Sequence, residues 1–425
     1  MPRKDEVDLD ITNVAHGGVF VARHEGRVVF VPDTMPGERV RARIADRKHD
    51  RFWRAEALEV LEAAPERQEH VWSAAGIDRA PGQRPGGAEF GHIRLGHQRE
   101  LKRRVIVDAL QRTAKLDRGL IDALGVVVEP VAGETEDGTG WRTRVRLQVG
   151  EGGGIGPFAA RTHTVVPVDD LPLATALVQE STPFGQRFPG AESVEVVATG
   201  LGTVHVLVND APARRGDRLV RPPRRPAPIR ERVGDREFRV DARGFWQVHR
   251  AAATTLTAAV QSAVDEALFD PRAANLDLYG GVGLLSAALG DRFGPTLRIT
   301  SVESDEAATD DAAENLADWV GAAAVTGRVE HIVAGLVAGA SAMERARLRA
   351  ATVVLDPPRS GAGRAVVEAI AELRPAQIVY VACDPVSLAR DVASFAERGY
   401  PLRTLRAFDL FPHTRHVEVV AALTP

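Results

Sequence analysis

A single cysteine is the side chain best suited to covalent chemistry in this 425-residue chain. Cys383 follows the apolar run 378–382 (IVYVA) and comes directly before Asp384 and Pro385. We therefore expect it at the carboxyl end of a strand and near the start of a helix, where the pKa of a thiol can be lowered and the reactive thiolate favoured. Because a lone cysteine is more often a small buried apolar residue, the functional interpretation of Cys383 depends on this position.

A glutamate near the C-terminus is the candidate base. Glu418 ends the segment 411–418 (FPHTRHVE), which also contains two histidines, and it is flanked by Val417 and Val419. A glutamate at a strand edge is often only a solvated charge, whereas apolar neighbours favour a side chain that points into a cleft. The residues alone leave both interpretations open.

A glycine-rich turn and a carboxylate resemble the parts of a nucleotide site. The turn 280–283 (GGVG) follows the apolar run 276–279, and Glu303 ends the next predicted strand. Glycines let the backbone approach a ligand closely, and a carboxylate at the neighbouring strand end suits the two hydroxyls of a ribose. Dinucleotide and S-adenosylmethionine sites share this pattern, but Ser286 stands where the dinucleotide fingerprint has its last glycine.

Another carboxylate, Asp356, opens the segment 356–361 (DPPRSG) directly after the apolar run 352–355. Two prolines fix an extended backbone at this predicted strand end, where loops commonly carry function. Asp356 could accept a hydrogen bond from a cofactor or a base there. Such a turn also occurs simply as a connection between a strand and the next element.

The elements that position these residues are predicted to form a parallel sheet. Strand-like runs at 276–279, 297–302, 329–334, 352–355 and 378–382 alternate with alanine-rich helical segments. This alternation is typical of a Rossmann-like α/β fold, in which ligands bind beyond the carboxyl ends of the strands. Two further strands are expected at 402–407 and 416–423.

The N-terminal part of the chain has a different pattern, and we predict three domains. Short β-rich runs with turn signals indicate an OB-like β-barrel in residues 1–62. Residues 63–240 are expected to form a central α+β, largely β-rich domain, which starts with a Gly-, Pro- and Ala-rich insert at 63–95 and contains a helix at 98–116. Residues 241–425 form the α/β domain.

Bulk properties exclude some classes of protein. The net charge of −4 gives no overall electrostatic argument for nucleic-acid binding, so local groups such as the basic segment 218–232 or the alternating Arg142, Arg144 and Arg146 would have to provide it. Both groups could equally be solvated surface. The chain has no run of about 18 apolar residues, and we expect a cytoplasmic protein without membrane contact.

Four ordered motifs resemble those of the RNA 5-methyluridine methyltransferases that act on the tRNA T-loop and on 23S ribosomal RNA. These motifs are 244–248 (GFWQV), 356–361 (DPPRSG), 382–391 (ACDPVSLARD) and 411–418 (FPHTRHVE). The run 21–40 is similar to the TRAM domain, an OB-like barrel that binds RNA. The resemblance covers nearly the whole chain.

The resemblance implies an S-adenosylmethionine-dependent enzyme of tRNA or rRNA processing, with tRNA or 23S rRNA as its partner, and we expect a monomer. Cys383 would be the nucleophile that attacks uridine C6, and Glu418 would be the base. The cofactor contacts would come from Gln247, Tyr279, Glu303 and Asp356.

Many bacterial members of this family carry four cysteines that bind an iron-sulfur cluster after the barrel. Here Ala88 stands where a cluster cysteine is expected, and one cysteine cannot ligate a cluster alone. We therefore expect neither an iron-sulfur cluster nor another metal. This departure puts in doubt how the insert 63–95 folds.

Alternatives remain open at this point. A related methyltransferase could act on another RNA base or on a protein, and a nitrogen target would need no cysteine because its lone pair attacks directly. A degenerate RNA-binding protein that has lost catalysis is another possibility, and a dinucleotide oxidoreductase is a more distant one.

Overall fold

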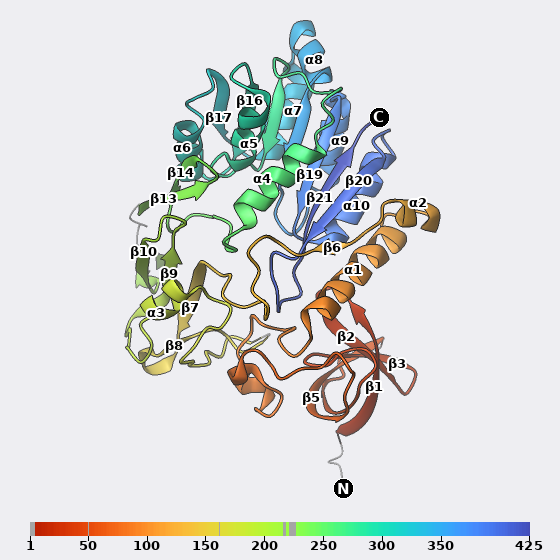
Figure 1. The fold of residues 1–425 in the computed structure, drawn as a ribbon, viewed down its shortest axis with the longest axis vertical. Coiled ribbons are helices and arrows are strands. Elements are labelled where there is room, and N and C mark those ends of the chain that lie inside the picture. Colours follow the sequence, from red (N-terminus) through yellow and green to blue (C-terminus); the bar gives the residue numbers. More distant parts are fainter. Residues whose placement is uncertain (1–4, 50, 161, 216–217, 221–226) are drawn as a thin grey trace.

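The computed structural model describes residues 5–49, 51–160, 162–215, 218–220 and 227–425 of the chain. An N-terminal barrel lies at one end of the molecule and a large mixed sheet lies at the other, with a smaller sheet beside them (Figure 1). The prediction of an α/β fold preceded by a β-barrel and a β-rich region is confirmed. The exact domain boundaries stay a prediction.

The barrel is closed and five-stranded, with the strand order β1-β2-β3-β5-β4. Its strands are β1 (Glu6–Ala15), β2 (Val19–His24), β3 (Arg27–Val31), β4 (Arg39–Asp46) and β5 (Phe52–Glu62). Alternate residues such as Leu9, Ile11 and Phe20 point inward, which is the period of two that the sequence pattern predicts.

The segment after the barrel contains two 3₁₀ turns, η1 (Ser73–Ala75) and η2 (Pro81–Gln83), and is tied to the barrel by buried polar groups. Arg84 donates from Nη1 to Asp33 Oδ2 at 2.7 Å and from Nη2 to the carbonyl oxygen of Ala57 at 3.1 Å. His92 Nε2 lies 2.9 Å from the carbonyl oxygen of Thr34. Hydrogen bonds and ion pairs thus hold this insert in place.

Helix α1 (Leu95–Arg112) runs from the barrel to the large sheet, and the short α2 (Arg118–Ala123) follows it (Figure 1). The central sheet has the order β10-β9-β7-β8, with α3 (Ala176–Ser181) beside it. Its strands are β7 (Arg144–Val149), β8 (Ile155–Gly156), β9 (Ala191–Ala198) and β10 (Val204–Asp210), with a third 3₁₀ turn, η3 (Glu151–Gly153), between β7 and β8.

Two hairpins connect the central sheet to the α/β part. They pair β11 (Ala213–Arg215) with β12 (Arg218–Val220), and β13 (Pro228–Val233) with β14 (Arg236–Asp241). Of the basic segment 218–232, residues 221–226 lie outside the described residues. Its role in RNA binding stays a prediction.

The large sheet has eight strands in the order β17-β16-β15-β18-β19-β21-β20-β6. The parallel strands are β15 (Asn275–Leu278), β16 (Arg298–Glu303), β17 (Gly321–Thr326), β18 (Thr352–Leu355) and β19 (Gln377–Ala382). The other edge consists of β20 (Leu402–Phe408), β21 (Glu418–Leu423) and β6 (Val128–Glu129). β21 runs antiparallel to both β19 and β20.

Helices cover both faces of this sheet, which explains why β15, β18, β19 and β21 are buried along their whole length. On one face, α1, α2 and α7–α10 contribute to one apolar core. On the other, α4 and α5 pack with β13 and β14 in a second core. The helices are α4 (Ala252–Ala263), α5 (Leu284–Phe293), α6 (Glu306–Asn315), α7 (Val329–Gly339), α8 (Ala342–Arg349), α9 (Arg364–Leu373) and α10 (Pro385–Ala396).

One predicted strand is wrong. Residues 329–334 begin helix α7, and the strand of this unit is β17 (Gly321–Thr326), which pairs with β16. Val329 and Val333 are four residues apart and both are buried, which is the spacing of a helix face and not of a strand. Among the described residues, no helix combines the length and the apolar character needed to cross a membrane.

Candidate functional site

A cavity of about 1070 Å³ opens at the carboxyl ends of the parallel strands. All six residues predicted to contact cofactor or substrate line it. Five lie at the ends of five different strands, namely Tyr279, Glu303, Asp356, Cys383 and Glu418, and Gln247 comes from a separate loop. Parallel strands deliver their carboxyl ends to one edge of a sheet, so Tyr279, Glu303, Asp356 and Cys383 meet there.

Glu418 reaches the same edge because its strand runs the other way. Ala382 at the end of β19 pairs with Val419 of β21, so Cys383 and Glu418 are the next residues along the two paired strands. Glu418 is buried, and Cys383 is partly exposed in the cavity. The antiparallel register thus places the candidate base beside the candidate nucleophile.

The glycine-rich turn between β15 and α5 is shaped to leave room beside its backbone. Tyr279 has a φ of 63°, and Gly281 and Gly283 have φ values of 53° and 87°, so the chain bends through the left-handed region here. Apart from Gly281 itself and its two chain neighbours, no heavy atom of the described residues lies within 4 Å of the point where a Cβ on Gly281 would stand. A ligand can therefore approach this peptide closely.

Glu303 joins the glycine turn to the next loop. Its Oε2 accepts from the backbone N–H of Gly281 at 3.2 Å, and its Oε1 accepts from the N–H of Asp305 at 2.9 Å. The carboxylate is therefore fixed at the cavity wall. Beneath it lies Asp277, whose Oδ2 accepts from Ser286 Oγ at 2.7 Å and whose Oδ1 has no hydrogen-bond partner among the described residues.

Gln247 lies on an irregular loop, 242–251, that is anchored by its aromatic neighbour. Trp246 is buried and its ring centre lies 5.7 Å from that of Phe238. Phe245, on the same loop, lines the cavity with 74% of its surface exposed. Phe245 belongs to the motif 244–248, but an exposed aromatic side chain leaves no periodic signal that would predict its place in the cavity.

Three carboxyl groups at or next to the cavity have raised pKa values: the buried Asp277 and Glu418 and the half-buried Asp356. Burial, and then the charge of Asp277, raise the pKa of Asp356 to about 7. Burial and Asp356 raise the pKa of Glu418 well above its ordinary value, whereas Arg359 opposes this shift. Burial raises the pKa of Asp277 to about 6. Near pH 7 Asp356 is therefore present in both its neutral and its ionised form, Asp277 is mostly ionised, and the neutral form of Glu418 is favoured.

The expected lowering of the Cys383 pKa is wrong. Burial, together with Glu418 and Asp356, raises the pKa of the thiol to about 12, and Arg359 only partly offsets this. The start of α10 does not serve the thiol, because the Asp384 carboxylate accepts from the N–H groups of Val386 and Ser387 at 3.1 and 2.8 Å. Proximity to a helix start does not by itself create a thiolate.

Basic residues reach the cavity from two other segments. Arg359 Nη2 lies 3.5 Å from His416 Nε2, and burial and Arg359 lower the pKa of His416 to about 3, so this imidazole is neutral. Arg142 also lines the cavity. Arg144 and Arg146 share one face of β7, as predicted, whereas Arg142 lies before the strand. The three do not form one exposed patch, because Arg144 is buried beside Glu231 at 3.5 Å and Arg146 is exposed.

The described part of the chain contains no group of three His, Cys, Asp or Glu side chains that could hold a metal ion. The groups that face the cavity instead suit an organic ligand with hydroxyl groups. Gly281 leaves open space beside its peptide, and Glu303 presents a fixed carboxylate that can accept hydrogen bonds.

Comparisons with known proteins point to one family. The model of the tRNA (Uracil-5-)-methyltransferase family matches residues 233–424, and the TRAM domain model matches residues 3–58. An RNA methyltransferase of Streptomyces coelicolor, named as uncharacterized, is 39% identical over 444 residues, which cover 99% of this chain and 93% of that protein. A similarly named protein of Bifidobacterium longum is 34% identical over 448 residues, covering 99% and 97%.

A solved structure has the same fold. The crystal structure of Pyrococcus abyssi tRNA (uracil-54, C5)-methyltransferase in complex with S-adenosyl-L-homocysteine aligns with a TM-score of 0.68. The alignment covers 98% of this chain and 100% of that chain, at 21% identity. At this identity the likeness establishes the architecture from the barrel to the last strand.

The raised pKa of Cys383 can be tested by alkylation, because the chain has a single cysteine. We expect its rate constant with iodoacetamide to rise about tenfold per pH unit from pH 7.5 to 9.5, whereas a free thiol with a pKa of about 8.5 levels off. Glu418→Gln should speed the reaction by removing a negative charge, and Arg359→Met should slow it. A rate that levels off below about pH 8 would show that the pKa is not raised.

Proposed function

Because the chain belongs to the tRNA (uracil-5-)-methyltransferase family of S-adenosylmethionine-dependent RNA methyltransferases, we propose that it methylates C5 of a uridine in tRNA or 23S rRNA through a covalent adduct on Cys383. The observation that carries this proposal is the pairing of Cys383 with Glu418 at the edge of the cavity. A nucleophile and a base on adjacent strands are what carbon methylation of uracil requires.

The chemistry explains why a thiol is needed. Uracil C5 is a poor nucleophile until an electron pair is pushed into the ring. The Cys383 thiol gives up its proton to solvent as its sulfur forms a bond to C6, the C5–C6 π electrons move toward C4 and its oxygen, and the resulting enolate makes C5 nucleophilic. S-adenosylmethionine, when bound, supplies an electrophilic methyl group on its sulfonium sulfur.

Glu418 serves the second half of the reaction. Its carboxylate takes the proton from C5, the released electron pair re-forms the C5–C6 double bond, and the C6–S bond breaks so that Cys383 leaves as thiolate. A carboxyl with a raised pKa is a stronger base when it is ionised, so burial suits Glu418 to this role. Protonation of Asp356 would also lessen its repulsion of the thiolate and the enolate.

The glycine turn and Glu303 would hold the cofactor. The Glu303 carboxylate suits the two ribose hydroxyls, and the open space beside Gly281 suits close approach of the cofactor to the backbone. Tyr279, Gln247 and Asp356 would make further contacts from the cavity wall. Asp356 also lies close enough to Glu418 to raise its pKa, so this carboxyl borders both the cofactor and the reacting base.

RNA would reach the cavity along the barrel. His16 Nε2 lies 3.4 Å from Asp384 Oδ2, and Arg415 Nη1 donates to the carbonyl oxygen of Gly17 at 3.0 Å. A turn of the barrel thus contacts both the residue after Cys383 and the loop before Glu418. The target base must leave its stack to enter the cavity, at a cost of a few kcal/mol.

Removal of the cofactor carboxylate should weaken binding without unfolding the protein. For Glu303→Ala we expect the Kd for S-adenosylmethionine to rise about 10- to 100-fold, because charge-assisted hydrogen bonds of about 1.5 to 3 kcal/mol are lost. Isothermal titration calorimetry measures this change. Glu306→Ala, at an exposed position three residues later, is the control and should leave Kd within about twofold. Equal Kd values for both variants would exclude Glu303 from the cofactor site.

Substitution of Cys383 and of Glu418 should block different steps of the reaction. We expect Cys383→Ala to form no covalent complex and to show no methyl transfer to RNA. Glu418→Gln should lower kcat by about 10²- to 10⁴-fold and accumulate protein covalently bound to methylated RNA, because the C5 proton is not removed. Denaturing gels with radiolabelled RNA separate these outcomes, and Glu397→Gln at the exposed end of α10 is the control. Methylation by Cys383→Ala at the wild-type rate would refute the covalent mechanism.

The RNA target can be found by mapping 5-methyluridine. In a strain that lacks the protein, mass spectrometry of tRNA and 23S rRNA should show the loss of 5-methyluridine at one or a few positions, and the wild-type gene should restore it. Cys383→Ala should not restore it. If 5-methyluridine is unchanged at every position and the purified protein does not methylate RNA from that strain, the proposed reaction is wrong.

A further inference from the structure

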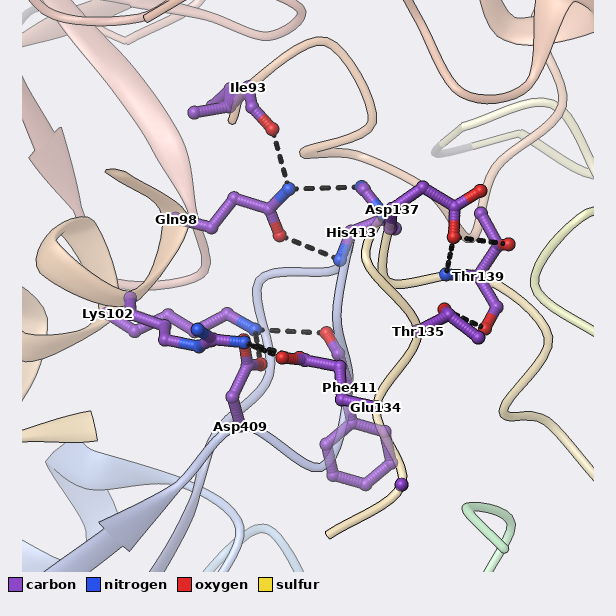
Figure 2. Close-up of polar contacts among 12 residues, drawn as sticks. Ile93, Gln98, Lys102, Glu134, Thr135, Asp137, Thr139, Asp409, Phe411 and His413 are labelled. Carbon is purple, nitrogen blue, oxygen red and sulfur yellow. Dashed lines mark hydrogen bonds and ion pairs between the residues drawn. The ribbon is translucent and has the colours of Figure 1, made fainter. Parts of the chain in front are cut away.

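The loop between β20 and β21 supplies one whole wall of the cavity. Phe411, Thr414 and His416 line the cavity from this loop, and the loop ends at Glu418. Residues 409–417 contain no helix or strand, so the sheet alone does not fix them. Figure 2 shows that side chains of helix α1 and the segment 134–139 lie beside this loop.

Gln98 of α1 contacts both the backbone and the imidazole ring of His413. Its Oε1 accepts from the backbone N–H of His413 at 2.7 Å, and its Nε2 lies 3.0 Å from His413 Nδ1 (Figure 2). His413 is completely buried and has a φ of 63°, a conformation that residues other than glycine seldom adopt. Such a backbone conformation persists only where its surroundings enforce it.

The partners of His413 also define its tautomer. Its Nε2 lies 2.6 Å from the carbonyl oxygen of Asp137, and because a carbonyl only accepts, Nε2 carries the proton. Nδ1 is then the acceptor for the Gln98 amide. Burial lowers the pKa of His413, which keeps the imidazole neutral. The ring is thus held between α1 and the segment 134–139 in one orientation.

Lys102, one turn further along α1, holds the same loop at its start. Its ammonium is almost fully buried, donates to Asp409 Oδ1 at 2.5 Å and donates to the carbonyl oxygen of Phe411 at 2.9 Å. Arg99 Nε also donates to Asp409, at 3.2 Å. Burying a lysine ammonium costs free energy unless the charge is paired and hydrogen-bonded. Lys102 and its acceptors on the loop must therefore keep these positions.

The contacts continue from Lys102 to the cavity wall. The carbonyl oxygen of Phe411 also accepts from Thr414, from its N–H at 3.1 Å and from its Oγ1 at 2.9 Å. Thr414 Oγ1 in turn accepts from the N–H of His416 at 3.2 Å. The line of hydrogen bonds therefore ends two residues before Glu418.

We propose that Gln98 and Lys102 are positioning residues that hold the loop 409–418 so that the Glu418 carboxylate faces the reacting base. The inference rests on the proposed function. Neither residue is among the cavity-lining residues, so neither contacts cofactor or substrate from its observed position. Both act through the loop, by contacts with its backbone and with the side chains of His413 and Asp409.

A specific kinetic consequence follows. Attack of Cys383 on C6 and methyl transfer to C5 do not require Glu418 to be in place. Elimination does, because the C5 proton must pass to the carboxylate while the C6–S bond breaks and the electron pair re-forms the C5–C6 double bond. A loosened loop therefore slows release of the methylated RNA from Cys383 more than it slows formation of the adduct.

The test compares Gln98→Met and Lys102→Met with Gln111→Met, the same substitution at an exposed position near the end of α1. For the first two we expect kcat to fall tenfold or more, Kd for S-adenosylmethionine to stay within twofold, and the fraction of enzyme covalently bound to methylated uridine RNA to rise. Gln111→Met should match the wild type. A merely structural role would lower turnover and covalent complex together, and that result overturns the proposal, as does a kcat within twofold of the wild type.

Amide hydrogen exchange keeps the proposal falsifiable where a variant is poorly active. In Gln98→Met, the amides of residues 409–417 should exchange faster while those of the barrel do not change. Unchanged exchange in this loop overturns the proposal even if activity falls. A wild-type protein that neither methylates RNA nor forms an adduct refutes the proposed function instead, and the exchange measurement still decides whether Gln98 holds the loop.

Discussion

The antiparallel pairing of β21 with β19 is the constraint on which the site depends. The strands β15, β16, β18 and β19 run parallel to one another. Tyr279, Glu303, Asp356 and Cys383 lie at or just after their carboxyl ends, at one edge of the sheet. A final strand in the parallel sense would carry Glu418 to the opposite edge. Because β21 is reversed, its first residue meets the residue after β19, and a base and a nucleophile become neighbours across a register fixed by backbone hydrogen bonds.

This arrangement brings several ionisable side chains together where burial disfavours their charged forms. Asp356 and Glu418 line the cavity, Asp277 is buried close enough to raise the pKa of Asp356, and the pKa values of all three are raised. The same burial raises the pKa of the Cys383 thiol, so reactivity cannot come from a preformed thiolate. Arg359 is the cation that opposes these shifts. The free-energy cost of burying these groups is offset by the packing around them. Two apolar cores lie on the faces of the sheet, and helix α1 contacts the loop before Glu418.

Much of this site could be predicted from the sequence because its residues directly follow apolar strand runs. Cys383, Asp356 and Glu303 each stand at such a point, and the barrel follows from its period of two. The strand predicted at 329–334 was wrong because a short apolar run does not by itself distinguish strand from helix. The pKa of Cys383 could not be predicted, since it depends on Glu418 and Asp356 in space. The contact between Gln98 and His413 spans 315 positions of the chain and leaves no local pattern.

The covalent role of Cys383 is the central claim, and RNA in which uridine is replaced by 5-fluorouridine tests it most directly. Fluorine at C5 cannot leave as a proton does, so elimination is blocked after methyl transfer and the adduct persists. Mass spectrometry of the digested complex should find one nucleotide, carrying both fluorine and the transferred methyl group, attached to the peptide that contains Cys383. Methylation of uridine RNA by the same preparation, with no nucleotide attached to Cys383 in the fluorinated RNA, would contradict this account.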